Sequence, residues 1–343
     1  TWPSSSSAAP AFWIAGASAF TRSAEAGEIR VEGATTPILI LPACMTRSLV
    51  TLFPHPYPPA RIQDKPLSGK RRFFVGIGGR GMLPLALIAQ GQGASVEGSD
   101  RALDQNRTAA KFDFLRNRGI ALFAQDGSGI TSGEQIVVAS TAVEETVADI
   151  VATRAAGATL MRRADLLAQL FNAAPQGVAV GGTSGKSTVT GMIGWILHHQ
   201  GHKPTIMNGA VMKNFVKPDA LFASALVGEG RTFVSEVDES DGSIALYAPR
   251  VAVLNNIALD HKSMEELRAL FAGFIGKAET AVLNLDNDEV APLAASVAPA
   301  KRISYSLTNA DATLLAQNIV LAADGVSFDV LDSASAAQAH VRL

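Results

Sequence analysis

Two glycine-rich loops, each placed between an apolar run and a helix-like segment, constrain the fold of this chain more than any other feature. The first is GIGGRG at residues 76–81, after the run RFFV, and the second is GGTSGKST at residues 181–188, after the run VAV. A buried strand that turns through glycines into a helix is the phosphate-binding unit of doubly wound α/β domains. The chain is therefore predicted to contain two such domains, each with a mainly parallel sheet.

Composition supports α/β layers and excludes several other classes. Of the 343 residues, 48% are hydrophobic and 17% are charged, as expected for buried parallel sheets. The net charge of -2 offers no basic field for nucleic acid. The single cysteine, Cys44, excludes a disulfide framework and favours a reducing, cytoplasmic setting. The apolar stretch at residues 36–53 is interrupted by Arg47 and by prolines, so no membrane span is predicted.

The first part of the chain differs from the remainder. Residues 1–70 include Pro/Ser-rich stretches without a steady hydrophobic period, and they predict an irregular or disordered leader. A secretory signal is disfavoured because no positively charged region precedes the apolar run. Residues 71–173 are assigned to a Rossmann-like domain, and residues 174–343 to a domain built around the second loop. Near the end, NIVLAADGVSFDVL predicts a β-hairpin with an Asp-Gly turn.

The first loop satisfies the pattern G-x-G-x-x-G. Gly76 would permit the tight turn, Gly78 the approach of a diphosphate, and Gly81 the close packing of the following helix. Asp100 ends the next strand-like run, 22 residues after Gly78, where a ribose-binding carboxylate is expected. Taken alone, the pattern is compatible with NAD, FAD or a UDP-sugar, and also with a glycine turn that binds nothing.

The second loop has the parts of a nucleotide-phosphate site. Its glycines allow backbone N–H groups to point inward, Lys186 brings a positive charge for the β- and γ-phosphates, and Ser187 brings a hydroxyl for magnesium. The full pattern G-x-x-x-x-G-K-[ST] would need a glycine where Val180 stands. The loop is therefore a shorter and less specific form of that pattern.

Polar side chains follow two later strand-like runs. EVDESDGS carries Glu236, Asp238, Glu239 and Asp241, and NNIALDH carries Asn255, Asn256, Asp260 and His261. Carboxylate oxygens suit Mg²⁺, although a solvated acidic turn and a structural histidine are ordinary alternatives. Because open parallel sheets bind ligands at the carboxyl ends of their strands, the coincidence of these residues with the second loop predicts one ATP and magnesium site.

The order of the motifs resembles that of the Mur ligase family, ATP-dependent amide-forming enzymes of peptidoglycan synthesis. The matching stretches are FFVGIGGRGM, VEGSD, VVASTAV, RRADLLAQL, VAVGGTSGKST, EVDESDGS, NNIALDH and LNLDND, which together cover roughly residues 72–290. Eight motifs in the family's order are far more specific than either loop. Within the family, the ligases that add L-alanine match this order most nearly.

The resemblance implies a ligand for each loop and replaces the dinucleotide interpretation of the first. The residues implied to bind a UDP-sugar are Gly76, Gly78, Gly79, Gly81, Met82, Asp100, Ser140 and Thr141. The residues implied to bind ATP are Gly182, Thr183, Ser184, Gly185, Lys186, Ser187 and Thr188. Catalytic roles are implied for Lys186, Glu236, Asn256 and His261, and Mg²⁺ binding for Ser187, Glu236 and His261.

The implied reaction joins L-alanine to UDP-N-acetylmuramate. ATP phosphorylates the muramoyl carboxylate, and the amine then attacks the acyl phosphate. Ser184 stands where the alanine-adding members usually have histidine, and Ser263 and Asn287 also depart from the family pattern. A ligase of murein tripeptide, or a non-catalytic protein that binds a UDP-sugar or nucleotide, therefore remains an alternative.

The family has a further C-terminal domain that binds ATP and the amine, and the chain ends at Leu343. We therefore expect that this domain is absent and that the chain has little or no ligase turnover. The sequence does not indicate an oligomeric state.

Overall fold

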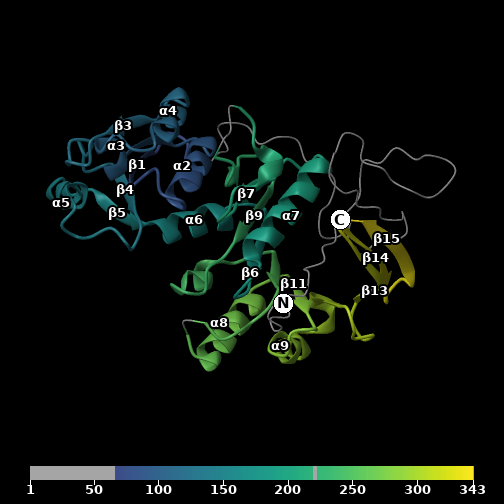
Figure 1. Ribbon diagram of the computed structural model, residues 1–343. Helices are drawn as coiled ribbons and strands as arrows, with labels where there is room; N and C mark the ends of the chain where they lie inside the picture. Colours follow the sequence, from purple (N-terminus) through teal and green to yellow (C-terminus); the bar gives the residue numbers. More distant parts are fainter. Residues whose placement is uncertain (1–65, 219–221, 261, 343) are drawn as a thin grey trace, which may run out of the picture. The chain divides into compact units, whose positions relative to one another are not determined.

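The computed structural model describes residues 66–218, 222–260 and 262–342, which form an α/β protein with two sheets (Figure 1). The predicted fold class is confirmed. Apart from residues 66–70, the predicted leader lies outside the described residues. Within the described part of the chain, no helix has both the length and the apolar character needed to cross a membrane.

The described residues belong to two compact units. One consists of residues 66–177 together with Lys203–Glu236, and the other of residues 178–202 together with residues 237–342. The predicted domain boundary after residue 173 falls between a helix that ends at Asn172 and a strand that begins at Gln176. The two compact units do not divide the chain at a single position, because Lys203–Glu236 belongs to the first unit. The boundary after residue 173 therefore stays a prediction.

The first sheet has five parallel strands in the order β3-β2-β1-β4-β5. The strands are β1 (Arg71–Val75), β2 (Ser95–Ser99), β3 (Ala121–Phe123), β4 (Ile136–Ala139) and β5 (Thr159–Arg162). The helices of this part are α2 (Met82–Gly91), α3 (Arg101–Asp104), α4 (Ala109–Asn117), α5 (Ala148–Ala155) and α6 (Arg163–Asn172). The strand order reverses between β1 and β4, so the loops that leave these two strands begin at the ligand-binding edge of such sheets.

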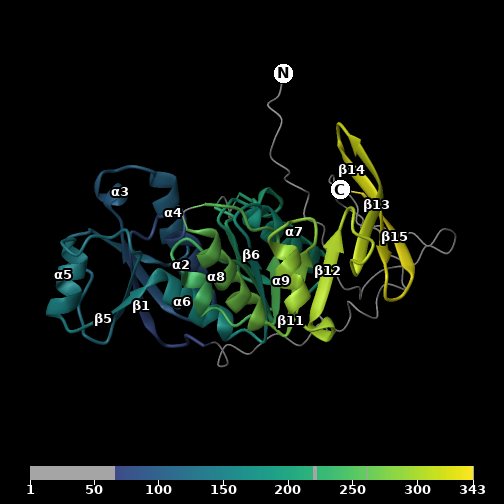
Figure 2. The ribbon, with the colours of Figure 1, turned by 90° about the horizontal axis from the view of Figure 1, so that it is seen from below.

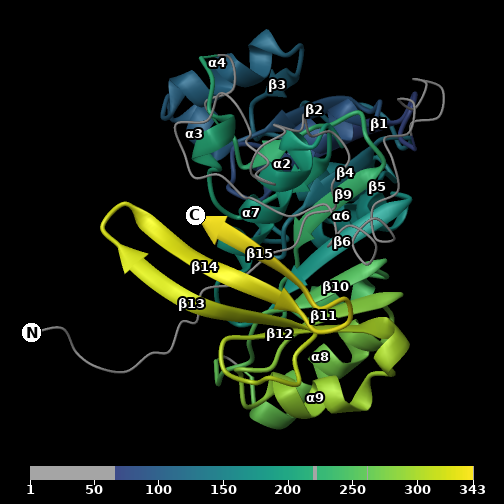
Figure 3. The ribbon, with the colours of Figure 1, turned by 90° about the vertical axis from the view of Figure 1, so that its right-hand side faces the viewer.

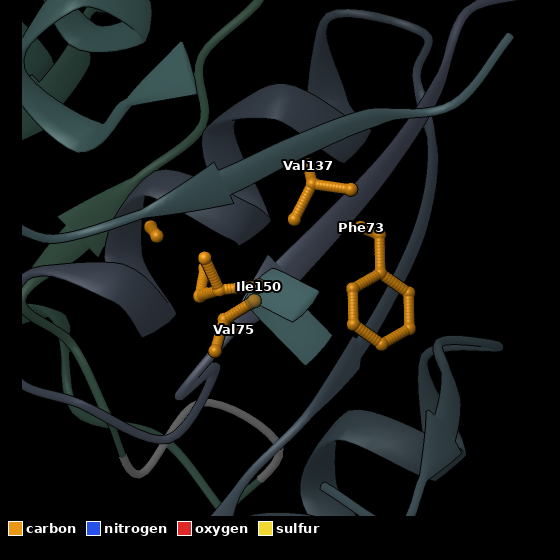
Figure 4. Packing of buried hydrophobic residues seen from close by; sticks show 5 residues of the cluster. Phe73, Val75, Val137 and Ile150 are labelled. Atoms are coloured by element: carbon orange, nitrogen blue, oxygen red, sulfur yellow. The ribbon is translucent and has the colours of Figure 1, made fainter. Parts of the chain in front are cut away.

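The centre of this sheet is fully apolar. Phe73 and Val75 of β1, Val137 of β4 and Ile150 of α5 pack together with at most 2% of their surface exposed (Figure 4). Phe74 points to the other face of β1 and is also fully buried. A strand covered on both faces has no polar alternation, which explains why RFFV reads as one continuous apolar run.

The second sheet has ten strands in the order β15-β14-β13-β12-β11-β10-β6-β9-β7-β8. The strands are β6 (Gln176–Gly181), β7 (Thr205–Met207), β8 (Ala225–Leu226), β9 (Thr232–Glu236), β10 (Val251–Leu254), β11 (Thr280–Asn284), β12 (Arg302–Ser306), β13 (Leu314–Ala322), β14 (Gly325–Asp332) and β15 (Ala337–Arg342). The α-helices are α7 (Lys186–His199), α8 (Met264–Gly276) and α9 (Val290–Ser296). Short 3₁₀ helices lie at Lys213–Phe215, Ser243–Leu246 and Pro299–Lys301.

The direction of winding changes between β6 and β10. After β6 the chain passes through α7 toward one side of the sheet, and from β10 it continues through α8 and α9 toward β11 and β12 on the other side. Right-handed crossovers then place these helices on opposite faces. Figures 2 and 3 show α7 on one face of the strands β10 to β12 and α8 with α9 on the other. This is a topological switch point, like the one in the first sheet.

The predicted hairpin near the end of the chain is confirmed. β13 and β14 are antiparallel, Ala322 pairs with Gly325, and β15 adds a third antiparallel strand (Figure 3). Gly325 is thus the first residue of β14, not a residue of the turn. The structure also contains strands that the sequence pattern did not indicate, namely β3, β5, β7, β8, β12 and β15.

Asp149 is a fully buried carboxylate in the first unit. It accepts hydrogen bonds from the Ser99 hydroxyl, at the end of β2, and from the Gly127 amide at 2.9 Å. Burial raises the pKa of the Asp149 carboxyl, and the two hydrogen bonds only partly oppose that shift.

Replacing Asp149 by asparagine is expected to change how stability depends on pH. Because its folded-state pKa lies above the unfolded value of about 3.9, Asp149 contributes stability below that pH and the contribution is lost as the pH rises through the folded-state pKa. The free energy of unfolding of the wild type minus that of Asp149→Asn should therefore decrease as the pH rises from about 4 to neutrality. Urea unfolding at a series of pH values measures this difference.

Asp165→Asn is the matched control. Hydrogen bonds from Arg162 lower the pKa of the Asp165 carboxyl, so the same difference should increase with pH for this variant. If the difference for Asp149→Asn also increased with pH, the burial argument would be wrong.

Candidate functional site

The second glycine loop lies at the switch point of the ten-stranded sheet. Gly181 ends β6 and pairs with Leu254 at the end of the parallel strand β10, and α7 begins at Lys186. Gly182 and Gly185 have φ angles of +139° and +77°, a region that favours glycine. The residues predicted for ATP thus lie together in the turn after β6 and in the first turn of α7. The first amides of a helix have no intrahelical partner and suit a phosphate.

The side chain of Asn256 fixes the shape of this loop. Its Oδ1 accepts hydrogen bonds from the Thr183 hydroxyl and the Ser184 amide, each at 2.9 Å, and its Nδ2 donates to the Ser184 carbonyl at 3.0 Å. The Thr183 amide also donates to the Asn256 carbonyl at 3.2 Å. The structure therefore places Asn256, for which the resemblance implied a catalytic role, as a residue that holds the loop.

Asn255 connects the loop to a strand further along the sheet. Its Nδ2 donates to the Ser184 carbonyl at 3.2 Å, and its Oδ1 accepts a hydrogen bond from the Tyr305 hydroxyl of β12 at 2.9 Å. Burial raises the pKa of the Tyr305 hydroxyl, so this group stays protonated and remains a donor. A continuous chain of hydrogen bonds therefore runs from β12 to the loop.

The ammonium group of Lys186 is turned back toward its own loop. Nζ donates to the Gly182 carbonyl at 2.8 Å and to the two carboxylate oxygens of Glu239 at 2.9 and 3.3 Å. The side chains of Lys186 and Glu239 are 19% and 5% exposed. The predicted phosphate-binding lysine is thus paired with a carboxylate that the sequence had assigned only to an acidic cluster.

The predicted magnesium ligands are described in part. Ser187 is in the first turn of α7, Glu236 is the half-buried last residue of β9, and His261 lies outside the described residues. Over residues 66–218, 222–260 and 262–342, no three His, Cys, Asp or Glu side chains are grouped to hold a metal. In nucleotide sites Mg²⁺ is usually bound by one or two protein oxygens together with phosphates and water. Taken singly, the hydroxyl of Ser187 and the carboxylate of Glu236 are oxygen ligands of that kind.

Gly209 leaves room for the Glu236 carboxylate. A Cβ atom at residue 209 would lie 2.1 Å from Oε1 of Glu236, and both residues belong to the same compact unit. The φ angle of Gly209 is not in the left-handed region. This position therefore requires the absence of a side chain and not a special turn.

The first glycine loop uses several of its N–H groups within the protein. The amides of Gly76, Ile77 and Gly79 donate to backbone carbonyls, and the Gly78 amide donates to the Asp100 carboxylate at 2.8 Å. The other Asp100 oxygen accepts from the first turn of α3. The carboxylate predicted to bind a ribose is therefore bonded to two backbone amides.

Packing within the protein explains why residue 78 is a glycine, and this explanation needs no ligand. A Cβ atom there would lie 3.0 Å from Oδ2 of Asp100 and 3.2 Å from the ring of Phe112. Met82, implied for the same site, is only 4% exposed, and its amide donates to the Gly79 carbonyl. Its side chain therefore belongs to the core.

Two other residues that are implied to bind the UDP-sugar lie at the same edge of the first sheet. Ser140 and Thr141 follow β4, which pairs with β1, the strand that leads into the first loop. Nη1 of Arg163, at the start of α6, would lie 3.2 Å from a Cβ atom on Gly81. A guanidinium beside the N-terminus of α2 is suited to an anionic group.

Some residues of these sites carried little sequence signal. The sequence offered no pattern for Tyr305 or Gly209, because both act through residues far away in the chain. The sequence pattern included Asn255 next to Asn256, but only the structure shows that Asn255 also contacts Tyr305. Arg163 was visible as a basic residue at a helix start, which is equally typical of a solvated surface.

Comparison with known families matches two segments. Residues 73–174 match the domain described as Mur ligase family, catalytic domain, and residues 180–343 match the Mur ligase middle domain. The chain is 33% identical over 271 residues to the UDP-N-acetylmuramate–L-alanine ligase of Dictyoglomus turgidum, covering 77% of this chain and 55% of that relative. The chain thus spans about half the length of the curated relatives it matches.

Two solved structures share the fold. The UDP-N-acetylmuramate–alanine ligase of Thermotoga maritima aligns with a TM-score of 0.66 and 22% identity, covering 80% of this chain and 60% of the other. The UDP-N-acetylmuramate:L-alanyl-gamma-D-glutamyl-meso-diaminopimelate ligase of Neisseria meningitides aligns with a TM-score of 0.62 and 23% identity, covering 77% of this chain and 84% of the other.

Asn256→Ala is expected to loosen the second loop. The variant loses the side-chain bonds to Thr183 and Ser184, so the free energy of unfolding should fall by about 1 kcal/mol. ATP affinity should fall by roughly tenfold, because ATP must then order the loop on binding. Titration calorimetry and urea unfolding measure the two effects.

Asn309→Ala is the control. It removes an exposed turn contact to Asp311 in the same unit and should leave ATP affinity unchanged. An equal loss of ATP affinity in both variants would contradict the role of Asn256.

Gly209→Ala is expected to displace the Glu236 carboxylate. If Glu236 is a magnesium ligand, the gain in ATP affinity caused by Mg²⁺ should shrink by about tenfold, as for loss of one charged contact, while affinity in EDTA stays the same. Gly276→Ala is the matched control, because a Cβ atom there meets nothing within 4 Å. Unchanged magnesium dependence in folded Gly209→Ala would exclude Glu236 as a ligand.

Proposed function

Because the chain belongs to the Mur ligase family, we propose that it is all or part of an ATP-dependent ligase that joins L-alanine to UDP-N-acetylmuramate. ATP binds at residues 182–188, and the UDP-sugar binds at the edge of the first sheet. The observation that carries this proposal is the loop at the switch point between β6 and β10, with the Lys186 ammonium 2.8 Å from the Gly182 carbonyl. The relative in Dictyoglomus turgidum supports L-alanine as the amine.

The proposed reaction has two steps. The muramoyl carboxylate attacks the γ-phosphoryl group of ATP and releases ADP, and the amine then attacks the acyl phosphate and releases phosphate. Lys186 and the first amides of α7 neutralise charge on the transferring group, and such charge stabilisation usually accelerates phosphoryl transfer more than any other effect. Ser187 and Glu236 would hold Mg²⁺, which supplies further positive charge. Asn256 and Asn255 keep the loop ordered.

The UDP-sugar site is proposed from the first sheet. Arg163 and the N-terminus of α2 provide positive charge for the diphosphate, and Ser140 and Thr141 provide hydroxyl groups at the same edge of the sheet. A tripeptide as the amine, and nucleotide binding without turnover, are the alternatives that experiment must separate.

Lys186→Ala tests the proposed ATP site. ATP affinity should fall by roughly 10- to 100-fold, because a hydrogen bond to a charged group is worth about 1.5–3 kcal/mol. Binding of UDP-N-acetylmuramate should not change, since that ligand is assigned to the other sheet. Titration calorimetry with each ligand measures both. A wild-type chain that does not bind ATP at millimolar concentration would refute the proposed function.

Phosphate release separates the alternatives. With ATP and UDP-N-acetylmuramate present, release that depends on L-alanine favours the proposed reaction, and release that depends on the tripeptide favours the recycling reaction. Binding of both ligands without release with either amine favours nucleotide binding without turnover.

A further inference from the structure

The pair formed by Lys186 and Glu239 is unlike the other ion pairs of the described residues. Both Glu239 oxygens lie within 3.3 Å of the same Nζ atom, and the two side chains are 19% and 5% exposed. The pair between Arg268 and Glu289, by comparison, has side chains that are 52% and 26% exposed. A carboxylate as buried as Glu239 needs a counter-ion, and separating the two would leave a buried charge.

The backbone around Glu239 is fixed from several directions. The Val237 amide donates to the Val180 carbonyl of β6 at 3.0 Å, and the Gly242 amide donates to the Glu239 carbonyl at 3.2 Å. Asp238 accepts a hydrogen bond from the Ser240 amide at 2.9 Å. These residues and Lys186 belong to the same compact unit. Glu239 is therefore held in place by the strand next to the glycine loop.

The Lys186 ammonium has three N–H donors. The Gly182 carbonyl accepts from one donor, and the two Glu239 oxygens, at 2.9 and 3.3 Å, face the other two. The donor of the longer contact can turn to a phosphate oxygen while the 2.9 Å bond to Glu239 is kept. A lysine side chain that was not held would lose rotamer freedom when it bound a phosphate. The Glu239 carboxylate removes that freedom before the nucleotide arrives.

We propose that Glu239 is a positioning residue. It holds the Lys186 ammonium beside the Gly182 carbonyl of the loop and stays paired with it when ATP binds. This inference rests on the proposed function, in which the loop binds ATP. It gives a specific role to Glu239, which the sequence had placed only in the acidic cluster of EVDESDGS. The role predicts that loss of the Glu239 charge weakens ATP binding. Coulomb repulsion alone predicts the opposite, because removing a negative charge near a triphosphate would strengthen binding.

The test compares ATP affinity of wild type, Glu239→Gln, Glu239→Asp, Lys186→Met and the double variant Lys186→Met with Glu239→Gln, by titration calorimetry. Each is measured with Mg²⁺ and in EDTA. Glu289→Gln is the matched control, because it neutralises a paired glutamate in the same unit. The melting temperature of every variant is recorded without nucleotide.

Positioning predicts that Glu239→Gln weakens ATP by about tenfold both with Mg²⁺ and in EDTA, and that Glu239→Asp retains part of the affinity. In the Lys186→Met background, Glu239→Gln should have no further effect on affinity. That background should also show a lowered melting temperature, which Glu239→Gln restores by removing the unpaired charge. Glu289→Gln should bind ATP like the wild type.

Three results would overturn the inference while leaving the ATP site intact. They are wild-type or stronger ATP binding by Glu239→Gln, a loss confined to measurements with Mg²⁺, and an equal loss in the Lys186→Met background. If Glu239→Gln failed to fold, a melting temperature of the double variant no higher than that of Lys186→Met would overturn the pairing itself. Failure of the wild type to bind ATP would overturn the proposed function and this inference together.

Discussion

The register between β6 and β10 determines which residues meet at the second glycine loop. Gly181 lies opposite Leu254, so the chain leaves both strands at the same level of the sheet. The backbone after β6 therefore meets the two asparagines after β10, and a Cβ atom on Gly182 would lie 3.1 Å from the Asn256 carbonyl. A slip of one residue would turn every side chain of the strand to the opposite face, and the asparagine contacts would be lost.

The two glycine loops were predictable because strand, turn and helix are adjacent in the sequence. Their contacts were not, since partners such as Lys186 and Glu239 stand 53 positions apart and meet only through the order of the strands. Gly78 shows the limit of a glycine pattern most clearly. The pattern states that a side chain is excluded there, but the space belongs to Asp100 and Phe112 of the same chain.

β3 and β5, two of the strands that the sequence pattern did not indicate, were missed for a physical reason. β3 and β5 are the edge strands of the first sheet, with three and four residues. Three of the four residues in β5 are exposed and the other is half-buried, so no apolar run marks it. A central strand such as β1 is buried on both faces and gives the opposite signal.

The way in which the second loop is held has a consequence for its variability. Ser184 is exposed, and both asparagines reach it through its amide and carbonyl groups. Its hydroxyl adds one further contact, of 3.2 Å, to Asn256. The side chain at position 184 can therefore be exchanged while the path of the loop backbone persists.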